Sequence, residues 1–348
     1  MRGSGLATVT QASPVLAERA SSSFSGTNNY YAYALPSNER YTLLQQMNAA
    51  NMKVLRIFVN GVTAGQKGST NVAIPDLEAK GFAQWDDTIL NAIDQLMVEA
   101  HAWNIKLLIS LYDKNVLQAG RVPYASTYGE QGFYTNSQAI SHYNDRISYI
   151  LNGHKNAKLG NKPWSQLSQY IIGYDVLNEP MINQGASFYT SHLDWVCNTA
   201  QQIRNNVGDK NQLVFTGGHS AAVSVQSRFF QANCPVDVVA IHDYTDAYDS
   251  YLPNALTAAR NAGKRLIVEE WGSLYGSGQV ANMQDNVKKM NKYGVPWLYW
   301  ELITNPDPHE GEDYEIQVGG ENWDTLKGLS QQTSGVAGAF DWSGPLAL

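Results

Sequence analysis

The sequence predicts an α/β fold, a single-domain (β/α)8 TIM barrel in which parallel strands close on themselves. Short apolar runs alternate with longer amphipathic stretches from about residue 53 to residue 301. The runs are apolar on both faces, which is typical of a parallel sheet covered by helices. Eight such runs can be identified along the chain, and this number matches a closed barrel, with a doubly wound open sheet as the alternative.

The expected strands are segments rich in Val, Ile, Leu and aromatic residues. In chain order they are 24–32, 53–59, 105–112, 171–177, 212–216, 236–242, 265–270 and 297–301. Apolar residues recur at helical spacing in 38–51, 85–103, 137–152, 188–206, 252–262 and 280–293. An open sheet of this kind usually binds nucleotides through a Gly-rich turn, but Gly217-Gly218 continues as His219-Ser220 without the needed spacing. The barrel is therefore preferred.

Two segments without periodicity are expected to be loops over the carboxyl ends of the third and eighth strands. They are 114–138, which contains Gly, Pro, Tyr and Ser, and 304–320, which is rich in Asp, Glu, Pro and Gly. The second segment contains an acidic cluster of Glu310, Glu312, Asp313 and Glu315. Such a cluster indicates either a solvated loop or a cation site, and the sequence leaves both alternatives open.

Composition narrows the class of partner. The formal net charge is -7 and the basic residues are scattered, which argues against a nucleic acid. No apolar run is long enough to cross a bilayer, so no membrane partner is expected. Only 16% of residues are charged, while the chain has 20 Tyr and 9 Trp. Aromatic faces and amides suit neutral, hydroxyl-rich ligands, so the expected partner is a neutral oligo- or polysaccharide.

The expected domain organisation is simple. Residues 1–23 are predicted to be a leader and flexible N-terminal segment, and residues 24–348 to form the (β/α)8 catalytic domain. No signal peptide is recognised in the chain, although secretion to the extracellular space and a monomeric state are expected. Cys197 and Cys234 are too few for a metal cluster. They predict either one disulfide or two buried thiols.

Two acidic residues, Glu179 and Glu270, each follow or end an apolar run of strand length. In a parallel barrel, this position delivers both carboxylates to one rim. Glycoside hydrolysis needs such a pair, because one carboxyl protonates the leaving oxygen while the other attacks the sugar carbon or activates water. The alternative is that Glu179 caps a helix and Glu270 forms a structural salt bridge.

Further polar and aromatic residues lie in or after other expected strands. They are Arg56, Asn178, His242, Tyr244 and Trp300. Trp300 could equally be a core residue or a platform under a sugar. A single histidine, here His242, is more often structural than functional. Arg56 within an apolar strand favours a functional interpretation, because burying an unpaired charge is costly. We expect all five to face the pocket that holds the two carboxylates.

With these motifs in this order, the chain resembles glycoside hydrolase family 5, in the clan of (β/α)8 retaining glycosidases. The resemblance rests on Asn178-Glu179-Pro180, His242-Asp243-Tyr244, Glu270-Trp271-Gly272 and Trp300. It implies that Glu179 is the acid/base and Glu270 the nucleophile, with Asn178 bonding the sugar 2-hydroxyl. No metal or cofactor is expected. Glu269 competes for the nucleophile role, but adjacent strand residues point to opposite faces, so only one of the two can enter the barrel mouth directly. In the resemblance, the position just before Trp271-Gly272 favours Glu270.

Within the family, the chain most resembles fungal endo-β-1,4-mannanases. The similar segments are Gly26-Thr27-Asn28-Asn29-Tyr30, Phe133-Tyr134-Thr135-Asn136 and Leu159-Gly160-Asn161-Lys162. Three positions depart from the mannanase pattern: Met181 replaces Arg, Phe58 replaces Trp, and Asp243 replaces Leu. Because these lie close to the expected sugar sites, a β-glucanase, a β-galactanase or an exo-β-glycosidase stays an alternative. An alternative of another class is a barrel that binds carbohydrate without cleaving it.

Overall fold

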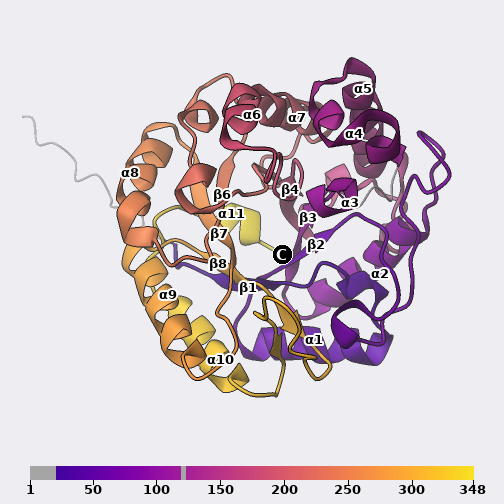
Figure 1. Ribbon diagram of the computed structural model, residues 1–348. Coiled ribbons are helices and arrows are strands. Elements are labelled where there is room, and N and C mark those ends of the chain that lie inside the picture. The colour runs from indigo at the N-terminus through magenta and orange to yellow at the C-terminus, as the bar shows by residue number, and fades with distance from the viewer. Residues whose placement is uncertain (1–20, 119–122) are drawn as a thin grey trace, which may run out of the picture.

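The computed structural model describes residues 21–118 and 123–348. Its main sheet is a closed barrel of parallel strands in which each strand pairs with the next along the chain, and β8 pairs with β1 (Figure 1). These strands are β1 (Ser25–Asn28), β2 (Val54–Phe58), β3 (Lys106–Ser110), β4 (Ile171–Asp175), β5 (Leu213–Phe215), β6 (Val238–His242), β7 (Arg265–Trp271) and β8 (Trp297–Tyr299). The predicted (β/α)8 barrel and its strand order are confirmed.

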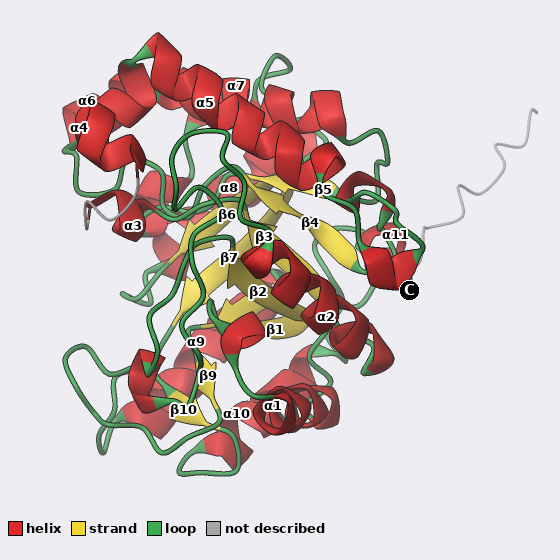
Figure 2. Ribbon diagram, turned by 90° about the vertical axis from the view of Figure 1, so that its right-hand side faces the viewer, coloured by secondary structure: helices red, strands yellow, loops and turns green. Residues whose placement is uncertain are grey.

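Helices surround the barrel, as Figure 2 shows from the side. The longer ones are α1 (Ser37–Ala49), α2 (Thr88–Ala102), α4 (Pro123–Thr135), α5 (Ser137–Ser148), α7 (Leu193–Asn206), α8 (Tyr248–Asn261), α9 (Gln279–Tyr293) and α10 (Trp323–Thr333). Shorter ones are α3 (Lys114–Gln118), α6 (Ala186–Ser191) and α11 (Ser343–Leu346). Within the described residues, no helix has both the length and the apolar character needed to cross a bilayer.

The loops predicted after the third and eighth strands differ from the observed structure. Residues 119–122 of the predicted loop 114–138 lie outside the described residues, and most of the described part is helical. Helix α4 begins at Pro123, whose fixed φ suits the first helical position. Gly129, with a φ of 72°, interrupts its regular periodicity. The segment after β8 contributes strand β10 (Ile316–Gln317), which pairs with β9 (Leu302–Ile303) in a small separate sheet (Figure 2).

Alternation along β2 explains how an arginine enters the barrel. Leu55 and Ile57 belong to the apolar layer between the strands and the helices, while Val54 belongs to the cluster inside the barrel. Successive strand residues point to opposite faces, so Arg56 and Phe58 share the inner face with Val54. Trp342 joins the inner cluster, and α11 lies on the barrel axis (Figure 1). The interior is therefore packed at one end and polar toward the other.

Two features bear on the predicted N-terminal segment and on the cysteines. Residues 1–20 of the predicted leader lie outside the described residues. Ser22 forms an antiparallel bridge with Ala337, and the backbone N–H of Ser23 donates to the carbonyl of Val336 at 2.7 Å. Cys197 on α7 and Cys234 before β6 form a disulfide. Of the two alternatives left open for the cysteines, the structure therefore has the disulfide.

Candidate active site

The predicted site residues meet at the carboxyl end of the barrel. His242 is the last residue of β6 and Glu270 lies near the end of β7. Asn178 and Glu179 follow β4 by a few residues, and Trp300 follows β8 directly. Because all eight strands are parallel, their carboxyl ends share one rim, where the loops of such barrels build their sites.

Arg56 is the central cation of this cluster and is fully buried. Its Nε donates to Asp175 Oδ2 at 2.8 Å, and its Nη1 donates to Glu270 Oε1 at 2.6 Å. A buried guanidinium is stable only when carboxylates and hydrogen bonds replace its water, and these contacts do so. The fork geometry also fixes the direction of the Glu270 carboxylate.

Glu270 has both carboxylate oxygens engaged. In addition to Arg56, the hydroxyl of Tyr244 donates to Oε2 at 2.9 Å. Burial raises the pKa of Glu270, and the nearby Glu179 carboxylate raises it further, while His242, Arg56 and Tyr244 act in the opposite direction. The charged form is thus held by three donors in a site that otherwise disfavours it.

Glu179 lies in a left-handed backbone conformation, with a φ of 49°. Its N–H donates to the carbonyl of Gly217 at 2.8 Å, which holds the strained turn in place. Its Oε1 lies 3.1 Å from His242 Nδ1 and its Oε2 lies 3.9 Å from Lys114 Nζ. Burial acts to raise the pKa of Glu179, but His242 and Lys114 outweigh it, so that the pKa is lowered.

His242 connects the two carboxylates. Its Nδ1 lies 3.1 Å from Glu179 and 3.4 Å from Glu270, and its Nε2 lies 3.2 Å from Glu269. Burial opposes the charged imidazole, but Glu270, Glu179 and Glu269 outweigh it and raise the pKa of His242 to about 10. The proton of this cluster therefore resides on the imidazole near neutral pH.

Glycines make room for this imidazole. Gly217 and Gly218 both have left-handed backbones, with φ of 81° and 77°. A Cβ on Gly217 would collide with the carbonyl oxygen of Leu177, and a Cβ on Gly218 would collide with the ring of His242. Only glycine satisfies both the backbone conformation and the close approach.

Glu269 does not point away from the barrel mouth, contrary to the alternation assumed above. Its Oε2 lies 3.2 Å from Arg56 Nη2 as well as 3.2 Å from His242. The pairing of β7 with both neighbouring strands shifts register next to these residues, which is typical of a bulge. The bulge turns both acids toward Arg56. The two acids differ in their surroundings: Glu269 is fully buried, whereas the carboxylate of Glu270 accepts a hydrogen bond from the Tyr244 hydroxyl.

Four polar residues of the cluster were missed by the sequence analysis as site residues. Asp175 and Asn28 bond to Arg56, at 2.8 Å and 3.2 Å, Asp113 accepts from Asn178 Nδ2 at 2.9 Å, and Lys114 faces Glu179. Asn178 accepts from Arg56 Nη2 at 2.9 Å through its other end. Asp175 could have been found from the sequence, because it is a carboxylate within the apolar run of β4. As with Arg56, burying an unpaired charge is costly, which favours a functional interpretation.

Trp300 stacks in an aromatic cluster next to Arg56, whose guanidinium carbon lies 4.7 Å from the centre of the Phe58 ring. Its ring lies 5.9 Å from Tyr30 and 6.1 Å from Phe58, with both pairs stacked. These rings border a cavity of about 550 Å³ that also contains polar side chains. The polar residues of its wall include Asn60, Gln66, Lys67, Asp76, Asp113 and Asn115. Aromatic faces with amides and carboxylates beside them suit a sugar.

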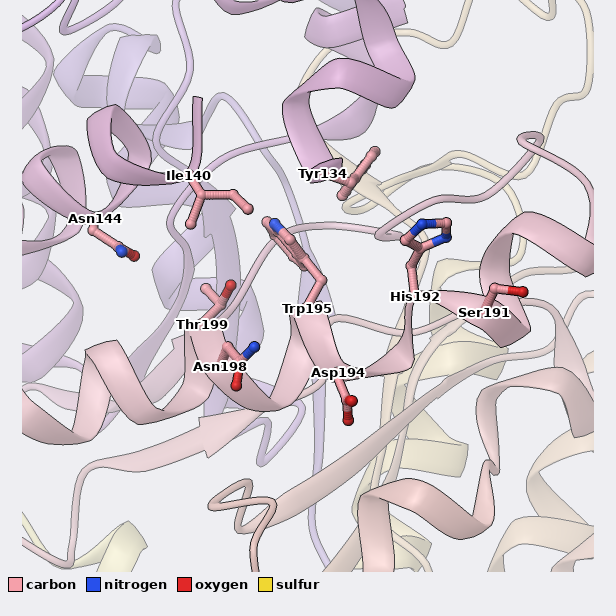
Figure 3. A pocket seen from close by; sticks show the side chains of 9 residues that line it. All are labelled: Tyr134, Ile140, Asn144, Ser191, His192, Asp194, Trp195, Asn198 and Thr199. Atoms are coloured by element: carbon pink, nitrogen blue, oxygen red, sulfur yellow. The ribbon is translucent and has the colours of Figure 1, made fainter. Parts of the chain in front are cut away.

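A second pocket lies on the outer side of the barrel and is separate from the carboxylates. Figure 3 shows this pocket, of about 180 Å³, with Trp195 and His192 between residues of α4, α5 and α7. None of the residues of the carboxylate cluster lines it, whereas Asp113, which accepts a hydrogen bond from Asn178, lines the cavity of about 550 Å³. The cavity that adjoins the candidate site is therefore the one at the barrel mouth.

Two groups in the described part of the chain have donor atoms that suit a metal. Glu179, His242 and Glu270 offer donor atoms within 4.8 Å of one another, as do Asp307, His309 and Asp313 after β8. In the first group, hydrogen bonds to Arg56 and Tyr244 already engage the carboxylate of Glu270. That arrangement is suited to acid, base and nucleophile chemistry.

Comparison with known proteins gives the family. The family described as cellulase (glycosyl hydrolase family 5) matches residues 15–306. A probable mannan endo-1,4-beta-mannosidase A of Aspergillus niger is 24% identical over 322 residues, covering 83% of this chain and 79% of the relative. Mannan endo-1,4-beta-mannosidase 1 of Arabidopsis thaliana is 27% identical over 250 residues, covering 66% of this chain and 56% of the relative.

The solved structure of an endo-1,4-beta-mannanase from Rhizomucor miehei has the same fold. It superimposes with a TM-score of 0.68 at 18% identity, covering 90% of this chain and 95% of that one. At this identity the likeness concerns the fold, whereas the family match spans most of the chain. The chain belongs to glycosyl hydrolase family 5 and is a glycoside hydrolase.

Proposed function

We propose that the chain is an endo-β-1,4-mannanase that works with retention of configuration, with Glu179 as acid/base and Glu270 as nucleophile. The observation that carries the proposal is the spacing of the two carboxylates. Donor atoms of Glu179 and Glu270 lie within 4.8 Å of each other. Retaining glycosidases have carboxyl groups about 5–5.5 Å apart, whereas inverting ones leave about 6.5–9.5 Å for a water molecule.

The nucleophile role suits Glu270 better than Glu269. Glu270 is fixed by Arg56 and Tyr244 and adjoins the charged imidazole of His242, so positive charge and hydrogen bonds favour its ionised form. Glu269 is fully buried beneath this layer. A carboxylate that attacks an anomeric carbon must reach the substrate, and the side chain of Glu270 is 5% exposed whereas that of Glu269 is 0% exposed.

The acid role of Glu179 requires a proton when the glycosidic bond breaks, and His242 is its source. The imidazole Nδ1–H lies 3.1 Å from Glu179 Oε1. The proton passes to Glu179 and then to the leaving oxygen, while Glu270 forms the ester with the anomeric carbon. Water then attacks the ester, Glu179 takes one of its protons, and Glu270 departs as a carboxylate. The proton returned to His242 restores the starting state.

Mannan is proposed because of the relatives and because two of the three departures from the mannanase pattern, Met181 and Asp243, do not line the cavity. Met181 is buried, and its N–H donates to Tyr134 Oη at 3.1 Å. Asp243 bonds to Thr245 and Tyr251 at the start of α8. Phe58 is the departure that lies on the cavity wall, where it stacks with Trp300.

Secretion and an extracellular polysaccharide substrate are part of the proposal. The Cys197–Cys234 disulfide is typical of proteins from oxidising compartments. The low content of charged residues, 16%, and the net charge of -7 fit a neutral glycan rather than a polyanion. We propose a monomer, since a single barrel carries both carboxylates of the site.

The test is a substrate panel with product analysis. Purified protein is incubated with mannan, β-glucan, β-galactan and aryl β-glycosides, and product lengths and the first anomer formed are recorded by chromatography and NMR. We expect mannan to give a mixture of short oligosaccharides with the β-anomer first. Release of monosaccharide alone would show exo action instead of endo action. An α-anomer as the first product would overturn the retaining mechanism. Preference for another glycan would overturn the assignment of mannan as the substrate.

A binding-only barrel is distinguished in the same assay. Glu270→Gln serves as the matched control, because it removes the nucleophile without changing the shape of the side chain. Mannan hydrolysis by the unmodified chain that disappears in this variant supports an enzyme acting through Glu270. Equal release of reducing ends by both proteins would contradict the assignment.

A further inference from the structure

The segment between β9 and β10 holds a compact group of one histidine and two aspartates. His309 Nδ1 lies 2.6 Å from Asp313 Oδ2 and 3.6 Å from Asp307 Oδ2. The side chains of Asp307 and Asp313 are 8% and 10% exposed, although the segment lies at the surface. The donor atoms of all three residues lie within 4.8 Å of one another.

Buried carboxylate oxygens without partners point to an absent cation. Asp307 Oδ2 and Asp313 Oδ1 are inaccessible to solvent and have no hydrogen-bond partner among the described residues. Asp307 Oδ2 faces His309 at 3.6 Å, which is beyond hydrogen-bond distance. Asp313 Oδ2 lies 2.6 Å from His309 Nδ1 and Asp307 Oδ1 accepts from the backbone N–H of His309 at 3.1 Å, so one oxygen of each carboxylate has a partner and the other does not. Buried carboxylates without a partner are costly, and a divalent ion would compensate both.

The neighbouring basic side chain does not compensate the charge of Asp307 and Asp313. Lys67 is the basic side chain that approaches the segment, and it forms its ion pair with Glu315. The two acids share one imidazole as their nearest basic group, at 2.6 Å from Asp313 and 3.6 Å from Asp307. This arrangement has the charge and the donor types of a metal site.

We propose that Asp307, His309 and Asp313 form a binding site for a divalent cation of the zinc class, with water completing the coordination. One imidazole nitrogen with two carboxylates is a set that zinc accepts, and tetrahedral donors at about 2.1 Å stand roughly 3.4 Å apart. The Nδ1 to Asp307 distance of 3.6 Å is close to this value. The 2.6 Å between Nδ1 and Asp313 Oδ2 is a hydrogen-bond distance, which the ion would open when it enters.

The site differs from the acidic cluster noticed in the sequence. Of that cluster, Asp313 belongs to the site, while Glu315 is paired with Lys67 and Glu310 and Glu312 are exposed. Asp307 and His309 complete the set instead.

The ion would join two loops at the barrel mouth. The carbonyl of Asp313 accepts from the N–H of Tyr275 at 2.8 Å, and the Tyr275 ring stacks on His309 at 3.9 Å. The adjacent Tyr314 ring lies 4.8 Å from Tyr244, the hydroxyl that bonds Glu270. A cation at this point would brace the loops after β7 and β8 beside the predicted nucleophile.

Zinc binding to the full chain tests the proposal. The protein is treated with EDTA, freed of chelator, and titrated with zinc chloride by calorimetry at pH 7.5. We expect one tight equivalent, and the double variant Asp307→Asn/Asp313→Asn should weaken it by about 100-fold or more. His309→Gln, at an exposed position that does not threaten folding, should weaken it by at least about 10-fold.

The matched control is Glu310→Gln/Glu312→Gln, which removes the same charge from the same loop at exposed positions. It should keep the affinity within about twofold, because exposed charges are screened. Zinc held instead by Glu179, His242 and Glu270 would survive substitution of both aspartates. The proposal is overturned by such retained binding, by equal loss in the control, or by no uptake in the unmodified chain. The readout is metal binding, so it does not depend on the proposed mannanase activity.

Discussion

Arg56 and Arg146 are both fully buried and both bond to several acidic groups, yet their surroundings differ in one respect. Arg146 on α5 pairs with Asp76 at 3.1 Å and with Glu78 at 3.2 Å, and its Nη2 donates to the carbonyl of Val59 at 2.7 Å. Arg56 pairs with Asp175, Glu269 and Glu270. Each guanidinium also lies over an aromatic ring.

The difference lies in the second partner of each carboxylate. Glu78 is fully buried and accepts from the Tyr124 hydroxyl at 2.9 Å, so the Arg146 cluster contains groups that keep their protons. In the Arg56 cluster, His242 bonds to Glu179 and Glu269 and carries a proton that can move. A buried arginine with several carboxylates therefore stabilises the fold in the Arg146 cluster and forms part of a reactive centre in the Arg56 cluster.

The largest expected effect breaks the reactive cluster at its carboxylates. Glu179→Gln and Glu270→Gln each should lower kcat on mannan by about 10³-fold or more, since each removes a group that acts in bond cleavage. The fold should persist, because both changes preserve shape. Reducing-end assays and circular dichroism measure the two properties. A variant with unmodified kcat would refute the role of that residue.

Matched lysine substitutions sharpen the comparison of the arginines. Arg56→Lys keeps the charge but loses the planar fork that orients Glu270, so kcat should fall by about 10²-fold. Arg146→Lys should leave kcat within about threefold and lower the free energy of unfolding by about 1–3 kcal/mol, through unsatisfied buried acceptors. Steady-state kinetics and urea unfolding separate these outcomes. Equal loss of kcat in both variants would contradict the distinction drawn between the clusters.

The pH dependence of stability should differ between the clusters. The pKa of His242 is raised from 6.5 to about 10. Its charged form therefore stabilises the folded state fully below pH 6.5, and this contribution disappears as the pH rises to about 10. The difference in unfolding free energy between the unmodified chain and His242→Asn should shrink over this range, on the order of a few kcal/mol.

Arg146→Lys provides the control for this measurement, because both side chains stay charged over most of the range. Its effect on unfolding should be nearly constant between pH 6 and about pH 9. Urea titrations at several pH values give both curves. Parallel curves for the two variants would show that His242 does not hold the proton of the Arg56 cluster.

The smallest expected effect concerns the sugar-binding wall. Phe58→Ala removes one ring from the stack with Tyr30 and Trp300 and should raise KM by about 10-fold with a smaller change in kcat, because a stacked aromatic contributes about 1–2 kcal/mol. Phe82→Ala, in an aromatic contact with Tyr124 away from the cavity wall, is the comparison. A shift in KM from Phe82→Ala alone would contradict the sugar-binding role.

Much of this fold could be predicted from the sequence because strands that are apolar on both faces leave a clear pattern. The eight strands were located with errors of a few residues at their ends, where pairing decides the boundary. Helix α4 was missed because Gly129 interrupts its periodicity. The local composition of 114–138 is typical of a loop. The packing of Phe133 and Tyr134 against the core, which the local sequence does not show, favours the helix instead.

Within the candidate site, residues with a distinctive position were found and those that depend on geometry were not. Arg56 and Glu270 stand out because charges are rare in buried strands. The inward turn of Glu269 could not be predicted, since a bulge is a property of strand pairing and not of one segment. The location of the proton on His242 likewise depends on three carboxylates that come together from two distant parts of the chain, the turn after β4 and strand β7.

The Gly217-Gly218 turn sets a limit on how this chain can change. The wall of the cavity, to which Phe58 at the end of β2 belongs, can accept new side chains and so new sugars. The turn cannot, because any side chain at 218 would occupy the space of the His242 ring. In directed evolution, libraries should therefore vary the cavity wall while both glycines stay fixed, and even Gly218→Ala should be recovered only among inactive clones.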